Sequence, residues 1–164
     1  LIILTSVIGW WLLSPLFINV EVNEENPITL EEHEKIKDSM KDSVIKDSMS
    51  NEDKSLSIKL GIFVDGDERH HVAGDLLLIK NKDTSFIRFE NFNATNGPDL
   101  YVVLSKNENP AKNGPGEIHI LQELKGNKGN QNYLIKDISL DNYKSVLIYC
   151  KAFSVVFGYA SIKK

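Results

Sequence analysis

Short stretches of strand-forming residues, separated by turn residues, fill the chain from residue 56 onward and limit its fold more than any other feature. In residues 56–64, aliphatic side chains occupy every second position, from Leu56 to Val64, which predicts a strand with one face in the core. Turn residues follow at "DGDE", and later apolar stretches are bounded in the same way by Asn, Asp, Gly or Pro. The pattern predicts an all-β domain, an antiparallel sandwich or barrel of about eight short strands.

The chain divides into three segments of different composition. Residues 1–20 hold no charged side chain and are long enough for a transmembrane helix, since roughly 20 apolar residues cross a bilayer. Residues 21–55 carry 11 acidic and 5 basic side chains, and residues 56–164 form the predicted β domain. We therefore expect a membrane anchor, an acidic stalk and one folded domain. A cleaved signal peptide, or an element that assembles with a neighbouring subunit, is an alternative for the first segment.

The acidic segment is predicted to be a solvated, partly helical stalk. Thr29 and Glu32 fit a helix capping box, and Ile36, Met40 and Val44 then recur every four residues as a narrow apolar stripe. Because a thin stripe buries little surface, we expect few contacts between the stalk and the domain. No cation follows the uncharged segment closely, so the positive-inside rule favours export of the C-terminal part and an extracytoplasmic domain.

The net charge and the single cysteine limit the classes of function that this chain can have. A net charge of -4 does not suit a dedicated nucleic-acid binder. The single cysteine, Cys150, cannot form a disulfide within the chain. Alternation places Cys150 on one strand face with Val146 and Ile148, which favours burial, whereas its place at the end of the run allows partial exposure. A reactive thiolate needs positive charge nearby, but Lys151 points to the opposite face of a regular strand.

Motifs for hydrolysis, phosphate binding and metal binding are not found. No G-x-S-x-G occurs, and "GNKGNQ" at 126–131 precedes a strand rather than a helix, so it is predicted to be a loop. The methionines lie in the stalk and the histidines lack metal-ligand spacing, so we expect no metal site and no classical enzyme activity. His70 and His71 are predicted to decorate a turn. The cofactor stays unknown, with a haem held by Cys150 and a histidine kept as an alternative.

Four motifs in order resemble the DM13 family, a small all-β module of extracytoplasmic proteins. They are "GIFVDGDERHHVAGDLLLI", "GPDLYVVLS", "ELKGNKGNQNYLI" and "SVLIYCKAFSVVFGYASI", and the resemblance covers most of residues 58–162. The last motif is the most specific, because aromatic, aliphatic and glycine residues follow Cys150 at the family's spacing. The resemblance implies a redox or electron-transfer role centred on the single cysteine.

The combined prediction is a membrane-tethered, extracytoplasmic module with Cys150 as its redox candidate. Asp99, Tyr149 and Phe153 are candidate supporting residues, although Asp99 is expected mainly to brace its turn. Asn93 opens a glycosylation sequon that is usable only outside the cell. The alternative function is a non-catalytic cell-surface module that binds a protein or glycan or assembles with copies of itself. Expected partners are the membrane, through residues 1–20, and a surface protein or electron-transfer partner.

Overall fold

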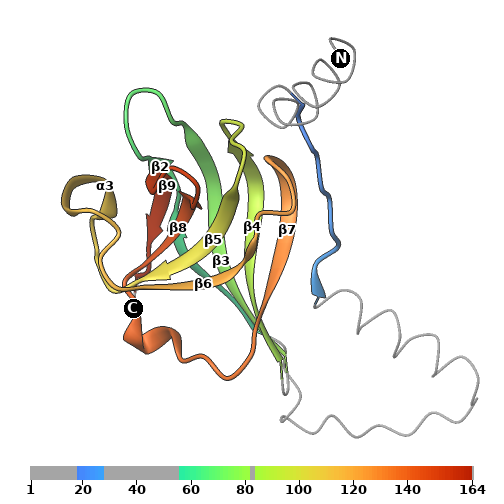
Figure 1. Cartoon of the computed structure of the whole chain (residues 1–164). Helices are drawn as coiled ribbons and strands as arrows, with labels where there is room; N and C mark the ends of the chain where they lie inside the picture. Colours follow the sequence, from blue (N-terminus) through green and yellow to red (C-terminus); the bar gives the residue numbers. More distant parts are fainter. Residues whose placement is uncertain (1–17, 28–55, 82–83, 164) are drawn as a thin grey trace, which may run out of the picture.

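The computed structural model describes residues 18–27, 56–81 and 84–163, and it folds the last two ranges into two layers of β-sheet (Figure 1). The strands are β1 (Leu56–Ile62), β2 (Val64–Asp65), β3 (Val72–Asn81), β4 (Thr84–Ala94), β5 (Leu100–Ser105), β6 (Ile118–Glu123), β7 (Lys128–Ile135), β8 (Ser145–Cys150) and β9 (Val155–Ser161). The described connections also contain a short helix, α3 (Pro110–Asn113), and a 3-10 turn, η2 (Leu140–Asn142).

The two sheets are open and lie face to face, so the fold is a sandwich. One sheet has four strands in the order β1-β3-β4-β7, and the other has five in the order β2-β9-β8-β5-β6. All the pairings between these strands are antiparallel. The predicted antiparallel all-β fold is confirmed, and the sandwich is the correct one of the two alternatives because neither sheet closes into a barrel.

Phe63 is the point where the chain leaves the first sheet and enters the second. Its side chain is 4% exposed, and its ring lies edge-on to the rings of Phe89 and Phe92, at centroid distances of 4.8 and 5.5 Å. Edge-to-face contacts of this kind add to the free energy gained by burying the rings. The crossing divides the first predicted strand into β1 and β2, so the described residues form nine strands rather than about eight.

The alternation predicted for residues 56–64 fails in its second half. A bulge between Lys59 and Gly61 shifts the pairing of β1 with β3 by one residue. Leu60 is buried as predicted, whereas Ile58 before the bulge is 37% exposed and Ile62 and Val64 after it are 59% and 47% exposed. A bulge adds one residue to one strand, so every later side chain changes face. The prediction that Ile62 and Val64 face the core is therefore wrong.

The inner faces of the two sheets form one continuous hydrophobic core. Its fully buried members come from both sheets and are Leu76, Ile87, Phe89, Val102, Leu104, Tyr133, Val146, Ile148, Cys150 and Ala160. Burying one large aliphatic or aromatic side chain contributes about 1.5–3 kcal/mol. All six residues of β8 are buried, because its outward Leu147 and Tyr149 form a second cluster with Val103 of β5, against which Tyr101, Ile118, Val156 and Tyr159 pack.

Residues 18–27, called the strap below, run beside β7 and pair with it through a parallel β-bridge between Glu21 and Lys128 (Figure 1). The Val22 N–H donates to the carbonyl of Lys128 at 3.0 Å, and the Glu24 N–H donates to the carbonyl of Asn130 at 2.9 Å. The strap runs parallel to β7, unlike the other strand pairs described above. It covers a row of backbone groups that β7 would otherwise expose at the edge of its sheet.

Side chains fix the register of the strap. The carboxylate of Glu24 accepts hydrogen bonds from Lys125 Nζ and from the backbone N–H of Asn132, both at 2.6 Å. Arg88, which is 5% exposed, donates through Nη1 to the carbonyls of Glu24 and Glu25 at 3.1 and 3.3 Å. Hydrogen bonds that involve a charged group are roughly twice as strong as neutral ones. A shift of the strap by one residue would break all four bonds.

Two glycines of the "GNKGNQ" motif let the strap approach β7 closely. A Cβ atom at Gly126 would overlap the carbonyl oxygen of Val20, and one at Gly129 would overlap that of Val22. Gly129 also has a φ of +95°, which other residues adopt only with strain. The motif, predicted to be a loop, enters β7 at its third residue. The expectation of few contacts between the acidic segment and the domain is therefore wrong for residues 21–27.

The remaining parts of the predicted anchor and stalk, residues 1–17 and 28–55, lie outside the described residues. In the ranges that are described, none of the helices has the length and apolar character needed to cross a bilayer. The anchor and the partly helical stalk therefore stay predictions. The boundary at residue 56 coincides with the start of β1.

Replacing Gly129 should loosen the strap without unfolding the sandwich. Gly129→Ala introduces a Cβ against the Val22 carbonyl, so the Val22 and Glu24 amides should exchange hydrogen on the order of tenfold faster, which corresponds to roughly 1.4 kcal/mol. Gly114→Ala is the matched control, because Gly114 also has a positive φ but a Cβ added there would meet no atom within 4 Å. Equal exchange rates in the two variants would contradict this role for Gly129.

Candidate functional site

Four connections meet at one end of the sandwich, which we call the loop end. They comprise residues 66–71, 95–99, 124–127 and 151–154. Backbone hydrogen bonds tie these connections to one another and to the adjacent strand ends: Thr95 to His71 at 2.9 Å, Ala94 to Asn127 at 2.8 Å, Leu124 to Leu100 at 2.8 Å and Lys151 to Asp99 at 3.0 Å. The loop end therefore forms one interlocked layer over the end of the core.

Cys150 lies in the core beneath this layer. It is the last residue of β8, has an exposed fraction of 0%, and pairs with Leu100 on one side and Val155 on the other. It belongs to the same core cluster as Val146 and Ile148, so the predicted shared face is confirmed. The alternative of a half-exposed thiol at the sheet rim is wrong, because the loop end covers the position.

The nearest cation in sequence is directed away from the thiol. Lys151 is exposed, and its Nζ lies over the ring of Tyr101 at 5.4 Å from the centroid. Tyr101 packs against the outer cluster of the sheet, whereas Cys150 belongs to the inner one. The prediction that Lys151 points to the opposite face is confirmed. Cys150 thus packs as a small apolar group in the closed fold.

Substitutions at Cys150 should distinguish the free-energy cost of lost packing from the cost of burying a polar group. Cys150→Ala removes one buried atom and should lower the free energy of unfolding by about 1 kcal/mol. Cys150→Ser should cost more, because the hydroxyl enters an apolar cluster without a matched acceptor. Denaturant titrations of both variants check the order. A serine variant as stable as the alanine variant would show that the site is more polar than its neighbours indicate.

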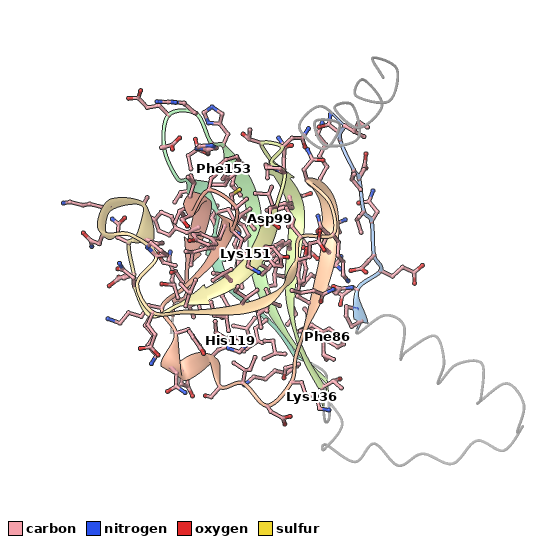
Figure 2. The ribbon with its side chains drawn as sticks, in the orientation of Figure 1. Phe86, Asp99, His119, Lys136, Lys151 and Phe153 are labelled. Atoms are coloured by element: carbon pink, nitrogen blue, oxygen red, sulfur yellow. The ribbon has the colours of Figure 1, made fainter. Side chains whose placement is uncertain are left out.

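The candidate supporting residues do not gather around the thiol. Tyr149 is 8% exposed and belongs to the outer cluster of the sheet, opposite Cys150. Phe153 is 69% exposed at the tip of the turn between β8 and β9 (Figure 2). The carbonyl of Asp99 accepts the Lys151 N–H, so the Asp99 backbone joins two connections. The structure therefore places all three near the loop end but none of their side chains in the core cluster of Cys150.

Two His–Asp pairs stiffen the first connection of the loop end. His70 Nδ1 lies 2.9 and 2.8 Å from the two carboxylate oxygens of Asp67, and His71 Nδ1 lies 3.0 Å from Oδ2 of Asp65. The ring of His70 also packs on Phe157, with 4.1 Å between the centroids. These histidines were predicted only to decorate a turn. The His-His pair after "DGDE" was the available signal, but the sequence does not say which histidine meets which aspartate.

The same bonds lower the pKa values of the two aspartates. The hydrogen bond from the His70 side chain, followed by that from the Arg69 N–H, lowers the pKa of Asp67 from 3.8 to about 2. The hydrogen bond from the His71 side chain, followed by that from the Val72 N–H, also lowers the pKa of Asp65. Both carboxylates are therefore held in their charged form by the folded loop.

The loop end should weaken in acid through Asp67. Because the folded pKa is lowered, the stabilisation is present above the ordinary pKa of 3.8 and is lost as the pH falls through about 2. Asp67→Asn should therefore destabilise the protein at pH 6 and have little effect near pH 2, as measured by denaturant unfolding at each pH. Glu68→Gln is the control for removing one charge. The same pH profile in both variants would contradict the pairing of Asp67 with His70.

The glycosylation candidate lies at the edge of the same region. Asn93 is exposed near the end of β4, and the third residue of its sequon, Thr95, accepts the His71 N–H through Oγ1 at 2.9 Å. The exposed side chain is accessible in the folded domain. Its modification stays a prediction, since it also requires export of the domain.

No group of three or more His, Cys, Asp or Glu side chains in the described ranges is arranged to hold a metal ion. His70 and His71 are each paired with an aspartate. His119 is exposed on β6, and its ring lies 6.4 Å from that of Tyr143. The histidines of the described ranges therefore do not form a metal-ion cluster with Cys150.

By its fold and site, the protein is a small open β-sandwich whose single thiol is buried in the core beneath the loop end. The model of the family described as Electron transfer DM13 matches residues 63–162. This match covers more than half of the chain, and the chain belongs to the DM13 family. It begins at the Phe63 crossing and ends one residue beyond β9. Neither the search of curated proteins nor that of solved structures gave a match.

Proposed function

We propose that this chain is a membrane-tethered, extracytoplasmic module that takes part in electron transfer through Cys150. The observation that carries the proposal is the match of residues 63–162 to the electron-transfer DM13 family. Cys150 supplies the only sulfur atom of residues 56–164. The uncharged residues 1–17, before the strap, and the acidic residues after it support a tether that leaves the domain outside the cell.

Burial limits how the thiol can react. Thiol–disulfide exchange requires direct contact between sulfur atoms, and Cys150 has an exposed fraction of 0%. The closed fold therefore protects the thiol, and its chemistry requires an opening of the loop end. Connections often open locally at a lower free energy than global unfolding. The contact of His70 with Phe157 and its bonds to Asp67 hold the first connection in place.

Weakening the loop end should speed the reaction of Cys150. His70→Ala removes the ring contact and the side-chain bonds to Asp67, so a small thiol reagent should modify Cys150 on the order of tenfold faster under native conditions. His119→Ala is the matched control, because His119 is exposed on β6. Mass spectrometry gives the modification rate, and denaturant unfolding gives the global stability of each variant.

The role of the thiol is decided by comparing its modification rate with the rate of global unfolding. A redox role requires Cys150 to react in the native protein faster than the chain unfolds globally. If the thiol reacts only at the rate of global unfolding in every variant, Cys150 is a packing residue and the proposal fails.

The outer edge of the larger sheet, which no other described strand pairs with, favours a second candidate function, that of a non-catalytic binding module. β6 is the last strand of its sheet, and Ile120 on it is 39% exposed. An edge strand of this kind can accept a strand from a partner protein. A colourless protein whose thiol stays silent until global unfolding would favour this function over electron transfer.

A further inference from the structure

The loop end carries exposed apolar side chains as well as the covered thiol. Phe153 is 69% exposed, and Ile18 and Val20 at the start of the strap are 50% and 49% exposed. Ile18, Val20, Pro98 and Leu124 line a half-open pocket of about 400 Å³ between the strap and two of the connections. Figure 2 shows Phe153 toward this end of the domain and Lys136 at the opposite end.

The strap fixes the place where the preceding chain meets the domain. Oδ1 of Asn19 accepts hydrogen bonds from Asn96 Nδ2 at 3.1 Å and from Asn127 Nδ2 at 2.9 Å. The Val20 N–H donates to Oδ1 of Asn127 at 2.7 Å. Asn96 and Asn127 belong to two connections of the loop end. Residues 1–17, which contain no charged side chain, therefore join the domain at this end.

The remainder of the strap keeps this attachment point fixed on the domain. The bonds of Glu24 and Arg88 lie further along β7, so the strap is held at both of its ends. A domain joined only by a flexible linker would sample many orientations. Because the strap is docked along β7, the point where residues 1–17 meet the domain stays beside the loop end.

We infer that the loop end faces the lipid bilayer and that Phe153, Ile18 and Val20 form its contact with the membrane surface. The inference rests on the proposed tethering of residues 1–17. Exposed aromatic and aliphatic side chains next to a membrane segment suit the interfacial region of a bilayer. The four connections carry three acidic side chains (Asp67, Glu68, Asp99) and three basic ones (Arg69, Lys125, Lys151), so the loop end has no net charge and suits zwitterionic lipid.

A spin label on each end of the domain tests this orientation. The full-length chain receives a single exposed cysteine, through Ala152→Cys beside Phe153 or through Lys136→Cys as the matched control, and is reconstituted into phosphatidylcholine vesicles. Both positions are exposed, whereas Cys150 is buried, so a brief reaction labels the new cysteine alone. We expect a water-soluble nickel complex to reach the label at position 152 several-fold less in vesicles than in detergent. Its access to the label at position 136 should not change.

The outcomes separate the orientation from the tethering. A chain that does not float with the vesicles refutes the tethering itself. A chain that floats while both labels stay equally accessible overturns the orientation alone.

Discussion

The packing of two sheets face to face is the interaction on which the rest of the structure depends. Each sheet hides one alternating set of side chains, and the two sets fill a single core. The crossing at Phe63 joins the sheets and places the connections that follow β2, β4, β6 and β8 at the same end. The location of Cys150 follows from this arrangement. It is the last residue of β8, and its side chain faces the core directly below those connections.

Regular alternation made much of the fold predictable from the sequence. The strands from β3 onward follow the apolar stretches, and the face shared by Val146, Ile148 and Cys150 could be derived from a period of two. The first strand was predicted less well, because it bulges between Lys59 and Gly61, where a Cβ on Gly61 would overlap the carbonyl of Ser161, a residue far away in sequence. A local pattern does not contain that contact, and so the faces of Ile62 and Val64 were assigned wrongly.

The site was predictable only in part, and for a related reason. The sequence identified the one thiol, but its complete burial results from connections that meet only after folding. The strap was missed because its composition is that of a solvated segment. Its binding depends on Arg88, Lys125 and the two glycines of a distant motif. An arginine at an outward position among apolar strand residues was the only local sign that this surface would be covered.

The contacts of the strap also reach a buried polar network. Tyr133, a core residue, donates through its hydroxyl to Gln131 Oε1 at 2.6 Å and accepts the Lys125 N–H at 3.1 Å. Burial raises the pKa of this tyrosine, so the hydroxyl keeps its proton and the bond to Gln131. Lys125 in turn binds Glu24 of the strap. The strap is thus connected through one lysine to the core, and its position is coupled to the packing of the aromatic side chains.

A docked strap changes what a cut in the chain would do. Residues 28–55 join the strap to β1, so a protease that cleaves there leaves two pieces that remain bonded along β7. The nicked molecule keeps the size of one particle in native buffer and separates into two fragments only when the sheet is denatured. Release of residues 56–164 from the strap therefore takes two events, cleavage of the chain and separation of the strap from β7. The second event is set by hydrogen bonds and by the ion pair of Glu24 with Lys125, not by the protease.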